Sequence, residues 1–173
     1  PQLNSLPSIN TFIDIGVGAD GTPEFYERYP EAKLLLIDPL EESKLYAEKN
    51  LENRDYTFYQ YAVGDKDKEE FINIEEEIGR STILNVTELN FEGPPIKKQK
   101  IGVKKLDNII KYSSEFGDIG MKIDTEGYEL NVILGASEIL KKTKFVVAEV
   151  RHNKISFDGQ YNLKDFVLAM HEN

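Results

Sequence analysis

Four acidic side chains in this sequence accompany short apolar runs, where a carboxylate can reach a ligand. Asp14 lies in the run TFIDI and Asp38 ends LLLID, while Asp124 and Glu126 follow the run GMKI. Between the first two acids the sequence DIGVGADG contains a G-x-G-x-x-G pattern, and glycines at such a place let the backbone turn sharply and approach a ligand. Glycines and acids in this arrangement indicate a nucleotide-binding crossover.

Asp14 helps to separate two kinds of nucleotide. A pyrophosphate is bound by backbone N–H groups and a helix dipole, which a nearby carboxylate would oppose. A carboxylate two residues before Gly16 instead suits a ligand with an ammonium and a sulfonium group, such as S-adenosylmethionine, and disfavours NAD. The alternative is that Asp14 is a buried acid that orders the loop through backbone N–H bonds.

Asp38 and Asp124 each allow a second explanation as helix caps. A carboxylate at the end of the second strand can accept the hydroxyl hydrogens of a ribose, but Asp38-Pro39-Leu40-Glu41 also fits an N-cap, a proline at N1 and a glutamate at N3. The two roles are compatible, because a capping carboxylate keeps a second oxygen. Asp124 or Thr125 likewise suits a cap, although capping leaves Gly127 unexplained, since glycine costs helix stability.

The elements that must position these residues alternate between strands and helices, which predicts a mostly parallel sheet wound on both faces. Apolar runs predict strands at Thr11–Ile15, Lys33–Ile37, Tyr56–Val63, Ile119–Ile123 and Phe145–Val150. Helices are expected at Thr22–Tyr29, Leu40–Asn50, Leu106–Ser113, Gly127–Leu134, Glu138–Lys142 and Leu163–His171. Extra strands are expected at Lys68–Ile74, near Thr82–Val86 and at Ile96–Lys104. We interpret residues 1–173 as a single domain.

Composition excludes several classes of function. A formal net charge of −10 over 173 residues disfavours nucleic acid and anionic membranes as partners. The sequence has no cysteine, which excludes disulfides and thiolate catalysis, and its two histidines, His152 and His171, cannot form a histidine-rich metal centre. No apolar segment reaches the roughly 18 residues of a membrane helix. We therefore expect a cytoplasmic protein without membrane insertion, and no spacing demands a metal.

The stretch KIDTEGYELNVILGA resembles the I-D-x-E-G-x-E-x-x-x-L-x-G signature of FkbM-type S-adenosylmethionine-dependent methyltransferases. Further similarity to that family lies in FIDIGVGADGTPEFYERYP, LLLIDPLEES, YQYAVGDKDKEEFIN, GRSTIL, VKKLDNII and FVVAEV, so it extends from Phe12 to Val150. The sequence departs in two places. Gly21 comes one residue late, which predicts a bulged loop. The last strands of the class I fold are missing, which suggests truncation at the C-terminus or a sheet edge covered by a partner, for instance in a homo-oligomer.

The resemblance implies a Rossmann-like fold of the class I methyltransferases with S-adenosyl-L-methionine as cofactor. By this resemblance Asp14, Gly16 and Gly18 hold the methionine portion and Asp38 takes the ribose. Ala62 and Asp65 flank the adenine, and Asp124 and Glu126 face the reacting methyl group. Ser81 and Thr82 either close over the site or form an ordinary polar turn.

Methyl transfer is an in-line displacement in which the protein aligns the reactants and excludes water. A hydroxyl acceptor on a sugar, lipid or small natural product can also need a base, for which the candidates are Asp124, Glu126, Glu149 and His152. A lone histidine is more often a surface residue. Two other functions stay open: an NAD-linked oxidoreductase on the same crossover, and a non-catalytic binding module with this fold.

Overall fold

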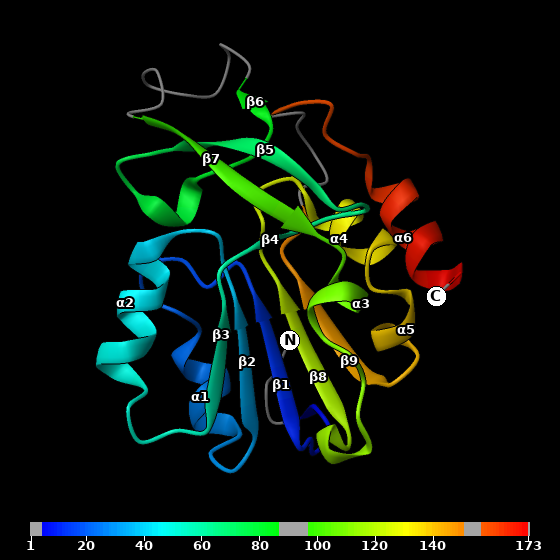
Figure 1. Cartoon of the computed structure of the whole chain (residues 1–173). Helices are drawn as coiled ribbons and strands as arrows, with labels where there is room; N and C mark the ends of the chain where they lie inside the picture. Colours follow the sequence, from blue (N-terminus) through cyan, green and yellow to red (C-terminus); the bar gives the residue numbers. More distant parts are fainter. Residues whose placement is uncertain (1–4, 87–96, 151–156, 173) are drawn as a thin grey trace.

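A parallel five-stranded sheet forms the centre of the protein, with the strand order β3-β2-β1-β8-β9. The structure is a computed structural model that describes residues 5–86, 97–150 and 157–172. The five strands, seen in the middle of Figure 1, are β1 (Thr11–Ile15), β2 (Lys33–Ile37), β3 (Tyr56–Tyr59), β8 (Ile119–Ile123) and β9 (Thr143–Ala148). The sequence order reverses next to β1, so the crevice of this sheet is expected where β1 and β8 end.

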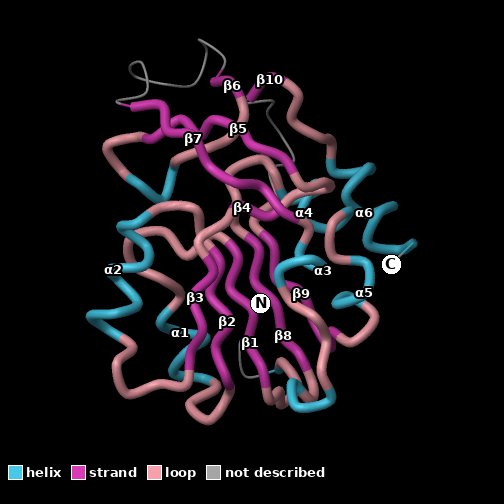
Figure 2. Tube along the Cα trace, viewed as in Figure 1, coloured by secondary structure: helices cyan, strands magenta, loops and turns pink. Residues whose placement is uncertain are grey.

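Helices cover both faces of the sheet (Figures 1 and 2). One face packs against α1 (Pro23–Arg28) and α2 (Glu41–Asn50), through a cluster that includes Phe25 and Ala47. The other face packs against four helices, α3 (Leu106–Ile109), α4 (Glu129–Leu134), α5 (Ser137–Leu140) and α6 (Leu163–Glu172). Strands buried on both faces read as continuous apolar runs, which is why the sequence predicts them well.

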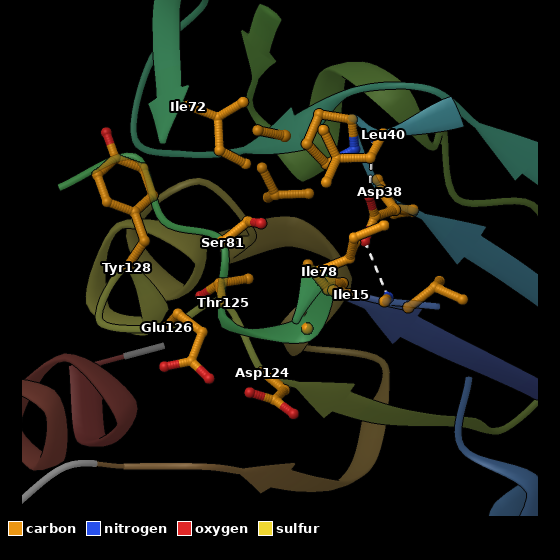
Figure 3. Close-up of a pocket in the computed structure, with 18 of the residues that line it drawn as sticks. Ile15, Asp38, Leu40, Ile72, Ile78, Ser81, Asp124, Thr125, Glu126 and Tyr128 are labelled. Atoms are coloured by element: carbon orange, nitrogen blue, oxygen red, sulfur yellow. Dashed lines mark hydrogen bonds between the residues drawn. The ribbon is translucent and has the colours of Figure 1, made fainter. Parts of the chain in front are cut away.

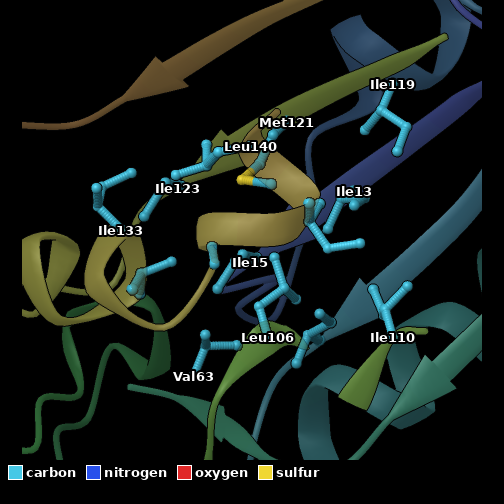
Figure 4. Close-up of a cluster of buried hydrophobic side chains, with 14 of the residues drawn as sticks. Ile13, Ile15, Val63, Leu106, Ile110, Ile119, Met121, Ile123, Ile133 and Leu140 are labelled. Atoms are coloured by element: carbon cyan, nitrogen blue, oxygen red, sulfur yellow. The ribbon is translucent and has the colours of Figure 1, made fainter. Parts of the chain in front are cut away.

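Alternation along β1 and β2 divides the core into two clusters. Ile13 and Ile15 join the cluster under α3 to α6, which Figure 4 shows around Met121 and Leu106. Phe12 packs on the opposite face against α1. Asp14 follows Phe12 by two residues, so it also points to the α1 face, into a buried position that only a paired charge can occupy.

A second sheet lies beyond the carboxyl ends of the central strands (Figure 1). It has the order β4-β7-β5, in which β7 (Lys97–Lys104) pairs in parallel with β4 (Ala62–Val63) and antiparallel with β5 (Lys68–Ile74). The short 3-10 helix η2 (Ile78–Arg80) follows β5, and η3 (Ser114–Phe116) precedes β8. A two-stranded ladder of β6 (Asn85–Val86) and β10 (Phe157–Asp158) completes the described sheets. The three-stranded sheet β4-β7-β5 covers the carboxyl end of the central sheet, which is the end where ligands bind in folds of this kind.

Three expectations about these elements need correction. The run Tyr56–Val63 is two strands in different sheets, because the chain turns at Tyr61, whose N–H donates to the carbonyl of Tyr59. The helix expected at Leu106–Ser113 ends at Ile109. The helix expected from Gly127 begins at Glu129, because Glu126 and Gly127 have positive φ angles of 50° and 97°.

The observed arrangement, a mostly parallel sheet with helices on both faces, confirms the Rossmann-like α/β fold that the sequence predicts. Among the described residues, none of the helices is both long and apolar enough to span a bilayer.

The glycine at the end of α4 allows a close backbone contact that we expect to limit substitution. A Cβ atom on Gly135 would lie 2.0 Å from the carbonyl oxygen of Gly64, which is backbone and cannot move cheaply. We predict that Gly135→Ala lowers the free energy of unfolding by about 2 kcal/mol or more. Gly79→Ala is the matched control, because a Cβ at Gly79 meets open space. Urea unfolding followed by circular dichroism measures the stability of both variants. Equal stabilities would mean that the contact between Gly135 and the Gly64 carbonyl does not limit substitution.

Candidate functional site

A cleft of about 750 Å³, counting space open to solvent, lies at the carboxyl ends of the central strands. Its floor comes from the ends of β1, β2 and β8, and its roof from the second sheet and the turn around η2, as Figure 3 shows. The lining includes most of the residues that the sequence singles out, namely Gly16, Gly18, Asp38, Ala62, Asp124 and Glu126. Its mixture of apolar side chains and a few acidic groups is typical of small-molecule sites.

Asp38 holds the glycine loop against the end of β2. Asp38 is only 6% exposed. Its two carboxylate oxygens accept hydrogen bonds from the backbone N–H groups of Gly18, at 3.1 Å, and Leu40, at 2.9 Å. Burial raises the pKa of Asp38, while these two N–H donors oppose the rise. The helix α2 begins at Glu41, so Asp38 supports the turn before the helix rather than acting as its N-cap. Each carboxylate oxygen still has a lone pair for a ligand.

The glycine loop passes very close to the end of β8. Gly16 has a φ of 82°, and a Cβ there would lie 1.8 Å from the carbonyl oxygen of Asp124. Only glycine satisfies both conditions. The late third glycine fits a turn in which the N–H of Gly21 donates to the carbonyl of Val17 at 3.0 Å.

Asp14 is fully buried and is not part of the cleft lining. One of its oxygens accepts hydrogen bonds from the hydroxyls of Thr22, at 2.8 Å, and Tyr26, at 2.5 Å. Its other oxygen lies 3.4 Å from Nζ of Lys122. These donors are side chains, not the backbone N–H groups that the sequence alternative supposes. Asp14 therefore reaches the cleft only through Lys122.

Lys122 is a functional candidate that sequence reasoning missed. It lies directly opposite Asp14 in the register of β1 and β8, and its side chain is 12% exposed at the cleft. Its ammonium donates to the carbonyl of Gly16 at 2.7 Å and lies 3.5 Å from a carboxylate oxygen of Asp124. Burial alone would lower the pKa of Lys122, but the charges of Asp14 and Asp124 raise it above its ordinary value. The sequence signal was a charged residue inside the apolar run GMKI.

The signature turn from Asp124 to Glu129 is organised by Glu129. Glu129 is 1% exposed. Its Oε1 accepts hydrogen bonds from the N–H groups of Thr125 and Gly127, both at 3.0 Å, and from the Thr125 hydroxyl at 3.1 Å. Its Oε2 accepts from the hydroxyl of Tyr161 at 2.7 Å. The carboxylate at the first residue of α4 thus fixes the turn, while Asp124 is left to face the cleft. The sequence pattern alone does not indicate this role for Glu129.

Glu126 occupies a left-handed backbone conformation that non-glycine residues rarely adopt. Its carbonyl accepts a 2.8 Å hydrogen bond from the hydroxyl of Thr82, which ties the segment after η2 to the signature turn. In Figure 3 the carboxyl groups of Glu126 and Asp124 lie on the side of the cleft away from Asp38. Ser81 also lines the cleft, and its hydroxyl accepts from the N–H of Glu75. Strained residues of this kind are concentrated at functional sites.

The remaining predicted residues lie elsewhere. Asp65 is half-buried outside the cleft lining, 3.4 Å from the side-chain amide of Asn131. Glu149 follows β9 with an exposed side chain that does not line the cleft. His152 falls outside the described residues. Within residues 5–86, 97–150 and 157–172, no cluster of three or more metal-ligating side chains occurs.

The bracing role of Glu129 can be tested by stability. We predict that Glu129→Gln lowers the free energy of unfolding by about 2 kcal/mol. The amide loses the charge that strengthens the bonds from the turn, and its NH2 group takes the place of the oxygen that accepts from the Tyr161 hydroxyl. Tyr161→Phe removes the hydrogen bond to Glu129 and should cost about 1 kcal/mol. Glu138→Gln, at a side chain 68% exposed, is the control and should change stability by less than about 0.5 kcal/mol. Denaturant titration measures the stability of all three variants. A Glu129→Gln protein as stable as the native one would contradict the role of Glu129 in holding the turn.

Comparison with solved structures finds a crystal structure of a methyltransferase FkbM from Methylobacillus flagellatus KT. The identity is 17% and the TM-score 0.44, and the match covers 78% of this chain and 30% of that one. This chain therefore spans less than a third of the length of that protein. No curated protein matches the chain.

Family models give a more extensive match. The model described as the methyltransferase FkbM domain matches residues 14–173, which include the glycine loop, Asp38 and the whole signature turn. Since the match covers nearly the entire sequence, this chain belongs to the FkbM methyltransferase domain family.

Proposed function

We propose that this protein transfers a methyl group from S-adenosylmethionine to a hydroxyl oxygen on a sugar, a lipid or another small natural product. The observation that carries the proposal is Asp38, a buried carboxylate that lines the cleft at the end of β2 and is tied to the glycine loop. A carboxylate at this place suits the two hydroxyls of a ribose. Membership of the family supports methyl transfer as the reaction class.

The residues of the cleft fit such a cofactor in their chemistry. Asp20, Asp38, Asp124 and Glu126 give the lining an excess of negative charge, which favours a sulfonium and disfavours a pyrophosphate. Leu40, Ala62 and Ile72 supply an apolar wall for an adenine, with Asp65 beyond it. The bound cofactor would supply a methyl group already activated by its positive sulfur. Gly16 and Gly18 would let the backbone approach the methionine portion, as the first motif implies.

The protein's own part in the reaction is to align the acceptor and to take its proton. Asp124 and Glu126 are the carboxylates that line the cleft away from Asp38, so we assign one of them as the base. Glu126 is the stronger candidate, because its strained backbone is held in place by Thr82 and by the brace of Glu129. Glu149, exposed and outside the lining, and His152 are less well supported.

Cofactor binding is the first test. We predict that S-adenosylhomocysteine binds and raises the melting temperature, whereas NAD does not, because the acidic lining repels its pyrophosphate. Asp38→Asn should weaken S-adenosylhomocysteine binding by about tenfold or more, since one good acceptor of the ribose hydroxyls is lost. Asp20→Asn, at an exposed acid in the same lining, is the matched control and should change affinity by less than about twofold. Calorimetric titration measures these affinities, and preference for NAD would sink the proposal.

The same titration has an expected dependence on pH. The raised pKa of Asp38 means that its ionised form is lost above the ordinary value of 3.8 as the solution is acidified, so affinity should fall in that range for the native protein. The folded state holds this proton more tightly than the unfolded chain. Protonation of Asp38 therefore favours folding at low pH, and its stabilising contribution is lost as the pH rises through the raised value. Protonation of Asp38 does not destabilise the folded protein, so weaker binding at low pH cannot be attributed to unfolding caused by this residue. Asp38→Asn should lack this part of the pH dependence.

The base assignment gives a further prediction. Asparagine tolerates the left-handed conformation better than glutamate, so Glu126→Asn should keep or raise stability by about 0.5 kcal/mol and leave S-adenosylhomocysteine affinity within about twofold. Methyl transfer to an acceptor found by screening with labelled cofactor should fall by about a hundredfold. Retained transfer would move the assignment to Asp124.

A further inference from the structure

Among the described residues that line the cleft, Lys122 carries the only positive charge. We infer that Lys122 binds the α-carboxylate of the cofactor's methionine portion, and that Asp14 acts on the cofactor only by holding Lys122 in place. This inference rests on the proposed cofactor. It gives Asp14 an indirect role in binding, because its carboxylate does not line the cleft.

The ammonium of Lys122 makes one close contact and two long ones, and a long contact can be exchanged for a ligand oxygen. Of its three N–H donors, one makes a close 2.7 Å bond to the Gly16 carbonyl. The carboxylate oxygens of Asp14 and Asp124 lie at 3.4 and 3.5 Å, beyond the roughly 2.7–2.9 Å of a strong charge-assisted hydrogen bond. Both acids hold Lys122 only through these long contacts, so a ligand carboxylate can take the place of the Asp124 contact and form a shorter bond.

The order of the strands places Lys122 at the amino-acid end of such a ligand. Ala62 follows β3, Asp38 follows β2, and Lys122 lies on β8, with β1 between β2 and β8. Two strand spacings, roughly 10 Å, therefore separate the ribose position from Lys122. A nucleoside with adenine near Ala62 and ribose at Asp38 extends over the glycine loop toward β8. There Asp124 and the Gly16 carbonyl suit its α-ammonium, and Lys122 suits its α-carboxylate.

Asp14 cannot take over either contact. Its second oxygen is bound by the hydroxyls of Thr22 and Tyr26, under the loop and away from the cleft. Its charge keeps Lys122 protonated despite burial, in accord with the raised pKa of that lysine. We therefore treat Asp14 as a positioning residue and Lys122 as the group that contacts the ligand.

The test combines protein variants with ligands that differ in one group. The ligands are S-adenosylhomocysteine, the same compound without its carboxylate, and 5′-methylthioadenosine, which lacks the amino-acid end. For the native protein, loss of the carboxylate should weaken calorimetric binding by about tenfold or more. For Lys122→Met, S-adenosylhomocysteine should weaken by a similar factor, while the two ligands without a carboxylate should change by less than about threefold. Asp14→Asn should reduce the discrimination between the first two ligands without weakening methylthioadenosine.

Lys122→Met leaves Asp14 buried without a cation, and this can unfold the protein. The double variant Asp14→Asn/Lys122→Met removes both charges and gives the same comparison if the single variant does not fold. Equal weakening of all three ligands in a folded variant would mean that Lys122 only supports the structure, and would overturn the inference. So would equal affinity of the native protein for the first two ligands. If the native protein binds none of the three, the proposed cofactor fails and the inference falls with it.

Discussion

The cross-strand pair of Asp14 and Lys122 is the interaction on which the architecture of the site depends. A charge in the interior of a parallel sheet is tolerated only when an opposite charge and hydrogen bonds compensate it. Here the compensation comes from α1, through the hydroxyls of Thr22 and Tyr26, and from β8 in exact register. The same lysine reaches the carbonyl of Gly16, so the pair joins β1, β8 and the glycine loop into one unit at the cleft.

A second buried carboxylate, that of Glu129, stabilises the signature turn in a similar way. Glu129 satisfies three donors of its own turn and the hydroxyl of Tyr161 on the segment before α6. The left-handed conformation of Glu126 costs free energy, and this network, together with Thr82, maintains it. The cleft therefore rests on two buried carboxylates, Asp14 and Glu129, that do not line it, while Asp124 and Glu126 do line it.

Sequence patterns predicted the central elements closely and the polar interior poorly. The strands at Thr11–Ile15, Lys33–Ile37 and Ile119–Ile123 match the expected bounds, because strands buried on both faces are apolar throughout. The end of β3 was misplaced because alternation does not reveal when a chain passes from one sheet to another. Gly16, Asp38 and Asp124 were located by their positions after strands, and all three line the cleft. Lys122 was missed because its partner Asp14 is distant in sequence and only the strand register brings the two together. Glu129 was missed because the sequence does not show how the turn directs the donors of Thr125 and Gly127 at its side chain.

Gly16 lies so close to the carbonyl oxygen of Asp124 that no side chain fits between them. A change of nearby side chains cannot relieve this contact, so the glycine and the path of the chain after β8 depend on each other. Anyone transplanting the loop after β1 into another scaffold would have to transplant the end of β8 with it.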